Sequence, residues 1–186
     1  VNPSHRGEGM MTGAGAAPRF SGKQEARQAV WDSLVEQGQA RFPFPPHHRI
    51  PNFAGAREAA DQLLGLPEFQ AARCIKVNPD APQRPVRLGA LRRGIVVYVP
   101  APRLRGGFKR FDPARIPDDQ LAAAASLSRG GRWAEKVPLA DLPEMDLIVT
   151  GSVAVTRDGR RCGKGTATPT SSTRSCATSD TLRRLS

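Results

Sequence analysis

Short apolar runs rich in β-branched residues constrain the fold of this chain more than any other feature of its sequence. The clearest run is Ile95–Val99 (IVVYV), directly before Pro100, and further runs are Arg73–Val77 (RCIKV) and Leu147–Val149. Continuous apolar runs of this length are typical of strands that are buried on both faces of a parallel sheet. Because helix-like stretches separate them, we expect an α/β fold, a three-layer sandwich with a mostly parallel sheet.

Four stretches of the sequence carry the spacing of helices. The first begins behind Ser21 and Gln24, which match a capping box, and Gly38 closes it. The predicted helices are Lys23–Gln37, Phe53–Leu66, Val86–Leu91 and Gln120–Ser128. Between the first two, Arg41–Asn52 holds four prolines and is predicted to be an extended loop. Ser152–Thr156 is a further candidate strand.

The two ends of the chain differ from its middle in composition. Residues 1–20 are rich in Gly and Ala and are predicted to form a flexible leader, in which Met10 and Met11 are alternative start positions. Residues 166–186 are mostly Thr, Ser and Ala without periodicity, and they are predicted to form a disordered tail. We therefore expect the folded domain to span residues 21–165 and to be incomplete at its C-terminal end.

The chain carries 28 Lys and Arg residues against 17 Asp and Glu residues, a formal net charge of +11, which calls for a polyanionic partner. Nucleic acid, a nucleotide and an acidic substrate all meet that requirement. No run of eighteen apolar residues is present, so we expect no membrane-spanning helix and no membrane partner. The cysteines (Cys74, Cys162 and Cys176) fit neither a disulfide framework nor zinc spacing, and we expect a reducing, cytoplasmic location.

The motif with the clearest chemistry is Asp158–Gly165 (DGRRCGKG), which follows an apolar segment. Glycines after a strand allow backbone N–H groups to approach a phosphate, and the side chains of Arg161 and Lys164 add positive charge beside them. The spacing matches neither a Walker A loop nor a dinucleotide-binding fingerprint. A hairpin turn with solvated basic residues is the alternative interpretation.

Three weaker motifs have both a binding and a structural interpretation. Lys23 and Arg27 lie four residues apart on one helix face, which is either a cationic site or a solvated surface. His47 and His48 have no acidic or cysteine neighbour at metal-ligand spacing, so a rigid structural loop is the simpler interpretation. Asn78–Gln83 follows a strand, where ligands bind in open α/β sheets, although a plain turn fits equally well.

Taken together, four stretches resemble the 5-formyltetrahydrofolate cyclo-ligase (methenyltetrahydrofolate synthetase) family, in particular its branch of methenyltetrahydrofolate synthase domain-containing proteins. The resemblance covers the chain from about Lys23 to Gly165. The stretches are HHRIPNF (His47–Phe53), KVNPDAPQ (Lys76–Gln83), VPAPRLR (Val99–Arg105) and DLIVTGSVAVTRDGRRCGKG (Asp146–Gly165). Two positions depart from the main family pattern: Val155-Thr156 stands in place of Phe-Asp, and Gly151-Ser152 stands in place of Pro-Gly.

The resemblance implies ATP-dependent cyclisation of 5-formyltetrahydrofolate to 5,10-methenyltetrahydrofolate, with ATP and Mg²⁺ as cofactors and a reduced folate as substrate. It implies that Lys23 and Arg27 contact the ATP phosphates. The matching positions of the glycine motif are Gly159, Arg161, Gly163, Lys164 and Gly165. The positions expected to bind the pterin side of the substrate are Arg49, Phe53, Asn78 and Asp80. No catalytic residue and no metal ligand is assigned.

A shift of reading frame explains the sequence after Gly165. The family continues with Gly-Tyr-x-Asp, whose aspartate helps to hold magnesium, whereas this chain continues with Thr166–Thr170 (TATPT). In the neighbouring frame, the codons of residues 167–177 permit Gly-Tyr-Ser-Asp-Leu-Glu-Tyr-Ala-Ile-Leu-Arg, which resembles the branch. We therefore expect the chain to be out of frame from about Thr166 and its activity to be impaired. Resequencing across the Gly165 codon tests this hypothesis.

Two other functions stay open at this point. A branch member that keeps the fold could bind a folate or a nucleotide without turnover. A basic nucleic-acid-binding module would also use the positive charge. However, only 5% of the residues are aromatic and no helix-turn-helix or RNA-binding signature is present, which argues against nucleic acid as a partner.

Overall fold

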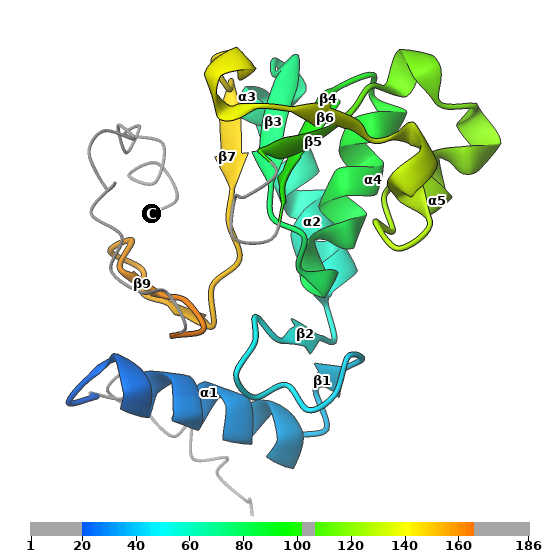
Figure 1. Ribbon diagram of the computed structural model, residues 1–186. Coiled ribbons are helices and arrows are strands. Elements are labelled where there is room, and N and C mark those ends of the chain that lie inside the picture. The colour runs from blue at the N-terminus through cyan, green and yellow to red at the C-terminus, as the bar shows by residue number, and fades with distance from the viewer. Residues whose placement is uncertain (1–19, 102–106, 166–186) are drawn as a thin grey trace, which may run out of the picture.

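The computed structural model describes residues 20–101 and 107–165. Two regions can be distinguished (Figure 1): a sheet with its covering helices, called the sheet region, and a helix–hairpin region in which the first helix meets a late hairpin. The leader expected at 1–20, apart from Phe20, and the out-of-frame tail expected at 166–186 lie outside the described residues. Among the described residues, no helix is long and apolar enough to cross a membrane.

Five strands form the main sheet of the described chain. They are β3 (Cys74–Val77), β4 (Val96–Pro100), β5 (Phe108–Phe111), β6 (Glu135–Val137) and β7 (Leu147–Val149), in the order β6-β5-β4-β3-β7. β3 pairs in parallel with β4 and β7, whereas β5 pairs antiparallel with β4 and β6. The sheet is therefore mixed, with β5 running against the other four strands.

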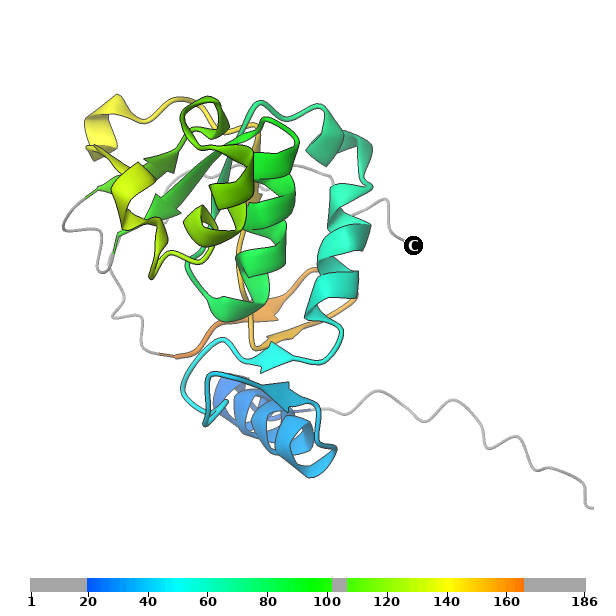
Figure 2. The same ribbon diagram turned by 90° about the vertical axis from the view of Figure 1, so that its right-hand side faces the viewer.

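Helices cover one face of this sheet (Figure 2). They are α2 (Ala56–Leu64), α3 (Pro67–Gln70), α4 (Arg84–Arg92) and α5 (Leu121–Ala124). Single turns of 3₁₀ helix lie at Ala81–Gln83, Pro113–Arg115, Asp118–Gln120, Gly130–Trp133 and Leu139–Asp141. A mixed sheet flanked by helices confirms the expected α/β class and is consistent with a three-layer α/β fold.

The apolar side chains between the sheet and these helices form one large cluster, the sheet core. Phe69, Ile75 and Val77 at its centre have no exposed surface. On the opposite face of the sheet, Leu142 and Met145 pack against a smaller cluster that includes Tyr98, Phe108 and Val137. Burial of this extent places most of the hydrophobic stabilisation of the described chain in the sheet region.

The helix–hairpin region lies below the sheet region in both views (Figures 1 and 2). It contains α1 (Lys23–Glu36) and two antiparallel strand pairs. β1 (Ala40–Arg41) pairs with β2 (Asn52–Phe53), and β8 (Ala154–Val155) pairs with β9 (Arg161–Cys162). A small group of buried residues, the Trp31 cluster, holds these parts together: Trp31, Ile50, Val153 and Cys162.

The predicted helices differ from the structure at some of their ends. The helix predicted over Phe53–Leu66 is observed as α2, which begins only at Ala56 because Asn52–Phe53 forms β2. The capping box predicted at the start of α1 is wrong: Gly22 is the N-cap without a side-chain cap, and the Ser21 N–H and hydroxyl both donate to the carboxylate of Glu25. The helix predicted over Gln120–Ser128 is limited to α5, because the chain turns after it and Leu127 has a φ of +43°.

The strands also differ in part from the expectation. Ser152–Thr156 does not join the main sheet, because β8 pairs with β9 instead. β7 was expected to be buried but lies at an edge of the sheet, where Ile148 is 46% exposed. β5 and β6 were not predicted from the sequence, because both strands carry charged residues.

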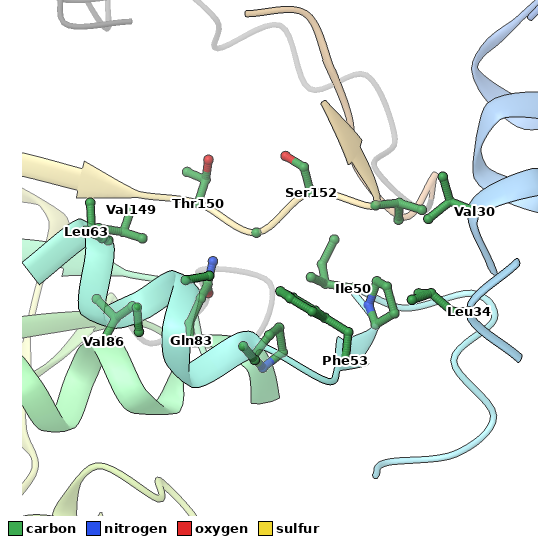
Figure 3. A pocket seen from close by; sticks show the side chains of 17 residues that line it. Val30, Leu34, Ile50, Phe53, Leu63, Gln83, Val86, Val149, Thr150 and Ser152 are labelled. Atoms are coloured by element: carbon green, nitrogen blue, oxygen red, sulfur yellow. The ribbon is translucent and has the colours of Figure 1, made fainter. Parts of the chain in front are cut away.

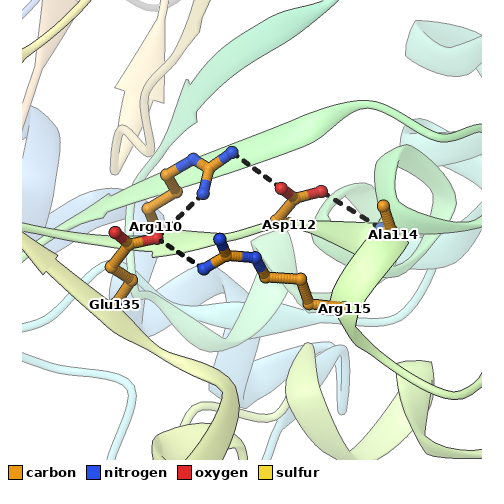
Figure 4. A network of polar contacts seen from close by, with 5 residues as sticks. All are labelled: Arg110, Asp112, Ala114, Arg115 and Glu135. Carbon is orange, nitrogen blue, oxygen red and sulfur yellow. Dashed lines mark hydrogen bonds and ion pairs between the residues drawn. The ribbon is translucent and has the colours of Figure 1, made fainter.

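Ion pairs explain why charged residues are tolerated in these two strands (Figure 4). Arg110 of β5 lies opposite Glu135 of β6 in the strand register and donates to its carboxylate at 2.8 Å. Arg110 also donates to Asp112 at 2.7 Å, and Arg115 donates to Glu135 at 3.4 Å. Cross-strand charge pairing therefore replaces apolar alternation at this side of the sheet.

Candidate functional site

A direct contact joins α1 to the chain that follows β9. The Nε of Arg27 donates a hydrogen bond of 2.6 Å to the carbonyl oxygen of Gly163, across 136 positions of sequence. The Nη1 of Arg27 donates to Gln24 at 3.0 Å, which fixes the orientation of the guanidinium group. The structure thus brings Arg27 to the glycine motif that was predicted to bind phosphate.

The glycines of this motif have different environments. Gly159 has a φ of +84° in the turn between β8 and β9, a conformation that glycine adopts without strain. A Cβ at Gly163 would meet nothing within 4 Å, so the space above its Cα is open. Gly165 has a φ of +90°, and a Cβ there would lie 3.2 Å from the guanidinium carbon of Arg27. The backbone at Gly165 thus lies close to the guanidinium group of Arg27, and the backbone at Gly163 has open space above it.

The two elements joined by this contact carry further basic side chains that are exposed: Lys23 on α1, and Arg161 and Lys164 in and after β9. Arg160 instead forms an ion pair of 2.8 Å with Asp158. The hydroxyl of Thr156, and in second place Arg160, hold the pKa of Asp158 below its ordinary value. The motif is thus a hairpin, as its alternative interpretation predicted, with cations that remain available to an anionic ligand.

Trp31 anchors the proline-rich loop to α1. Its indole N–H donates to the carbonyl oxygen of Arg49 at 3.1 Å, and the rings of His47 and His48 lie within 6 Å of the indole. His47 also contacts Asp32 at 2.8 Å, and this hydrogen bond is the main cause that lowers the pKa of Asp32. Because these contacts occupy the loop, the structure supports the structural interpretation of the two histidines.

An apolar cavity of about 370 Å³ lies between α1, α2 and the chain after β7 (Figure 3). Val30 and Leu34 of α1 line one side, and Leu63 of α2 lines the other. Phe53 and Ile50 contribute from the loop between these helices. Figure 3 shows the ring of Phe53 between Ile50 and Gln83.

The cavity lies at the carboxyl ends of two parallel strands. Val149 ends β7, and Pro82 and Gln83 belong to the turn that follows β3; all three line the cavity. Open α/β sheets bind their ligands at such strand ends. Val30 lies three residues after Arg27 on α1, so the cavity and the glycine motif adjoin the same helix.

Gln83 is one of the polar residues of this mainly apolar cavity, together with Thr150 and Ser152. It is 6% exposed, and its amide is satisfied when the nitrogen donates to the carbonyl oxygen of Asn78 at 3.1 Å and the oxygen accepts from the N–H of Gly151. A Cβ at Gly151 would lie 2.8 Å from Ile50 and 3.0 Å from the Gln83 amide. The glycine at position 151 therefore allows two walls of the cavity to approach each other.

The residues that were predicted to bind the substrate occupy different places. Phe53 lines the cavity, whereas Arg49, Asn78 and Asp80 are not among its lining residues. The buried Nε of Arg49 has no hydrogen-bond partner in the described part of the chain, so its guanidinium has capacity for a further acceptor. The carboxylate of Asp80 would lie 3.3 Å from a Cβ at Gly151, behind the cavity wall.

Arg87 holds the loop before Gln83 from inside the fold and was not predicted as a site residue. It is 3% exposed and donates to the carbonyl oxygens of Asn78 (2.7 Å), Asp80 (3.2 Å) and Ala125 (3.0 Å). Burial lowers its pKa to about 10. Gln83 was noticed only as the end of a loop. A basic residue in the middle of an apolar helix pattern is the signal that would have pointed to Arg87.

Comparison with known proteins agrees with these features. A model of the 5-formyltetrahydrofolate cyclo-ligase family matches residues 21–168. Several proteins named methenyltetrahydrofolate synthase domain-containing protein are similar to this chain. The Bos taurus protein is 43% identical over 145 residues (77% of this chain, 38% of that protein), and the Mus musculus protein is 44% identical over 145 residues (77% and 39%). The Homo sapiens protein is 38% identical over 152 residues (80% and 40%).

The chain spans about two fifths of the length of these relatives. The family model, in contrast, covers most of the chain and includes α1, the cavity and the glycine motif. The chain belongs to the 5-formyltetrahydrofolate cyclo-ligase family.

Proposed function

We propose that this chain catalyses the ATP-dependent closure of 5-formyltetrahydrofolate to 5,10-methenyltetrahydrofolate. The observation that carries the proposal is the hydrogen bond between Arg27 and Gly163, next to an apolar cavity at the strand ends. It supports a cationic site for a triphosphate directly beside a site for a flat heterocycle. Family membership supports the same pair of ligands.

The triphosphate is assigned to the surface around Arg27. Lys23, Arg161 and Lys164 are exposed cations on the two elements that meet there, and the open backbone at Gly163 admits close approach of a phosphate oxygen. Guanidinium groups bind phosphate as a fork, whereas lysine binds as a point charge. The side chains of this surface thus neutralise charge and orient the terminal phosphate, which is the main task of a protein in phosphoryl transfer.

The reduced folate is assigned to the cavity. Its volume and its lining by Val30, Leu34 and Phe53 suit a bicyclic ring, and Gln83 can orient polar edges of that ring. In the overall reaction, ATP phosphorylates the formyl oxygen, N10 attacks the formyl carbon, and ADP, phosphate and the N10 proton are released. An apolar wall helps by excluding water, which would otherwise hydrolyse the activated formyl group.

Magnesium is also expected from the family resemblance. In residues 20–101 and 107–165, however, no group of three or more His, Cys, Asp or Glu side chains is placed to hold a metal ion. In nucleotide sites Mg²⁺ is held mainly by the phosphates and water together with one or two carboxylates. No described residue is assigned to the ion in this proposal.

A turnover experiment tests the proposal. The full chain, and a version in which residues from Thr166 are restored to the neighbouring frame, are incubated with ATP and 5-formyltetrahydrofolate, and the methenyl product is followed by its absorbance. We expect product only when both substrates are present, and more from the restored chain. The separate prediction of impaired activity fails if the two chains are equally active.

Two results would favour other functions. Saturable binding of both ligands without product in either chain would identify a non-catalytic folate- or nucleotide-binding member. Absence of ligand binding together with nucleic-acid binding that weakens steeply with salt would favour a nucleic-acid-binding module.

A further inference from the structure

The two edges of the main sheet differ in how they are protected against pairing with another chain. At one edge, β6 carries the exposed side chains of Glu135 and Lys136. At the other edge (Figure 1), β7 consists of Leu147–Val149 (LIV), without a charged residue or a proline. Charged residues and proline on an edge strand discourage pairing with a further strand. Of these two edges, the β7 edge is therefore the one suited to receive a strand from outside.

The backbone of β7 offers hydrogen-bonding groups on its outer side. Within the described part of the chain, β7 pairs with β3 alone, in parallel. The N–H of Asp146, directly before β7, donates to the carbonyl oxygen of Cys74 at 3.1 Å. Backbone groups of alternate residues point to opposite edges of a strand, so those of Ile148 also face β3. The N–H and C=O groups of Leu147 and Val149 therefore point away from the sheet.

Ile148 is the uncovered apolar side chain of this strand. It is 46% exposed, whereas Leu147 and Val149 point to the other face of the sheet and pack against the sheet core. A second strand at this edge would bring a side chain opposite Ile148 and would cover part of its apolar surface. Backbone pairing and apolar burial would thus act together at the β7 edge.

Charges on either side of β7 indicate which strand fits. The chain before β7 and the β8–β9 hairpin after it lie at opposite ends of the strand (Figure 1). The segment before β7 carries three exposed acidic residues, Asp141, Glu144 and Asp146. The hairpin carries three exposed arginines against one aspartate: Arg157, Arg160 and Arg161, and Asp158. In an antiparallel pair of two copies, the acidic segment of each copy lies toward the basic hairpin of the other, so a second copy supplies the complementary charge by symmetry.

We propose that β7 pairs antiparallel with β7 of a second copy of this chain, so that the two main sheets join across a two-fold axis at Ile148. In this register, Leu147 of one copy lies opposite Val149 of the other as a hydrogen-bonded pair. The two Ile148 residues face each other as the non-hydrogen-bonded pair between them. The register thus uses the outward backbone groups of both strands. The proposal goes beyond the proposed function and needs no ligand.

Sedimentation of the full chain over a range of concentrations tests the proposal. A short edge interface is weak, so we expect a monomer–dimer equilibrium with a Kd on the order of 10 µM. Ile148→Glu should weaken the dimer by about tenfold or more, because two carboxylates would face each other across the axis. Within one copy the new carboxylate lies beside Lys76, its strand neighbour, which limits the cost to folding. Val35→Glu, at a β-branched residue of α1 that is 51% exposed, is the matched control and should dimerise like the unmodified chain.

Ile148→Cys tests the position of the axis. Residues of a non-hydrogen-bonded antiparallel pair have Cα atoms about 4.5 Å apart, which is within the range of a disulfide. Oxidised glutathione should therefore link this variant into a covalent dimer. The unmodified chain and Val35→Cys, treated in the same way, control for the natural cysteines and should stay largely unlinked.

The outcomes decide for or against pairing through β7. A full chain that stays monomeric up to about 100 µM, tenfold above the expected Kd, overturns the proposal, and the β7 edge is then open or covered within one copy. A dimer of undiminished affinity in Ile148→Glu, or a dimer that Ile148→Cys does not link, places the interface elsewhere and also overturns it. Unchanged urea midpoints establish that the variants are folded, and if Ile148→Glu does not fold, the linking of Ile148→Cys decides. None of these outcomes depends on the binding of ATP or folate, so the proposed function is tested separately.

Discussion

The sheet region and the helix–hairpin region are held together in different ways. The sheet core joins the strands β3, β4, β5 and β7 to four helices through a large set of buried apolar side chains, with Phe69 and Ile75 completely covered. The helix–hairpin region depends on the Trp31 cluster, whose buried members are Trp31, Ile50, Val153 and Cys162. Polar contacts such as Arg27 to Gly163 add to this small cluster.

Because of this difference in packing, the region that contributes most to stability is not the region that carries most of the candidate binding site. The candidate phosphate site and two walls of the cavity belong to the weakly packed region, while the strand ends that complete the cavity belong to the strongly packed one. Elements with few buried contacts open locally at lower free energy than the core of a domain. We therefore expect the helix–hairpin region to open and close on the sheet region while that region stays folded.

The largest effect on stability should come from Phe69→Ala, because Phe69 lies at the centre of the sheet core. Removal of a fully buried ring leaves a cavity and should lower the free energy of unfolding by about 3–5 kcal/mol. Urea denaturation followed by circular dichroism measures it. Phe42→Ala is the control, since this ring is 78% exposed and its loss should have little effect. A small loss for Phe69→Ala would mean that the sheet core does not dominate stability.

Trp31→Ala tests the weak region. We expect a loss of global stability of about 0.5–3 kcal/mol, smaller than for Phe69→Ala, because a region that detaches locally limits the cost. Hydrogen exchange should accelerate in α1 and in β8–β9, and not in β3 or β4. Trp31→Phe keeps a ring but loses the hydrogen bond to Arg49, and should show a milder form of the same pattern. If hydrogen exchange accelerated equally in both regions, the helix–hairpin region would not open independently of the sheet region.

Gly151→Ala acts where the two regions meet. The added methyl group would press on Ile50 and Gln83, and overpacking of this kind costs about 1–3 kcal/mol. We expect the affinity for the reduced folate to fall more than the affinity for ATP. Gly131→Ala is a suitable control, since its Cβ would meet nothing within 4 Å. Equal losses for both ligands would show that the cavity and the phosphate site are not separate.

The smallest effect on stability is expected from Asp146, which lies directly before the edge strand β7 of the sheet region. The N–H groups of Cys74 and Arg73 donate to the carboxylate of Asp146 at 2.9 and 2.8 Å and lower its pKa. The charged form thus stabilises the folded state above the unfolded pKa of about 3.9, and this contribution is lost as the pH falls through the lower folded pKa. Asp146→Asn should therefore lower the urea midpoint near neutral pH and flatten its acid dependence. Identical pH profiles for both proteins would contradict this role.

Sequence reasoning located the elements whose pattern is local. α1, β3, α4 and β4 were predicted nearly at their observed limits, because apolar spacing and the flanking Pro and Gly residues determine them. β5 and β6 were missed because Arg110 and Glu135 satisfy each other only across the two strands. Pairing of this kind is visible only when the strands are side by side.

The candidate site was predictable in its residue types and less so in its geometry. The glycine motif and Arg27 stood out in the sequence, but their contact spans 136 positions and depends on the folding of both regions. The loop after β3 and the chain after β7 approach each other closely in the fold. Only this approach shows the roles of Gln83, Gly151 and Arg87. A second pocket, between β1 and the starts of α2 and α4, is lined by Arg41, Arg57 and Arg84, and no local sequence pattern connects these residues.

The most direct test of the account is the affinity of the full chain for ATP, measured by calorimetry in the unmodified chain and in Arg27→Gln. The account places the triphosphate where α1 meets the glycine motif, so removal of the Arg27 charge should weaken ATP binding by about tenfold to a hundredfold. Arg92→Gln, an exposed arginine of α4 in the sheet region, should bind ATP like the unmodified chain. Equal ATP affinity in Arg27→Gln and the unmodified chain would contradict the central claim.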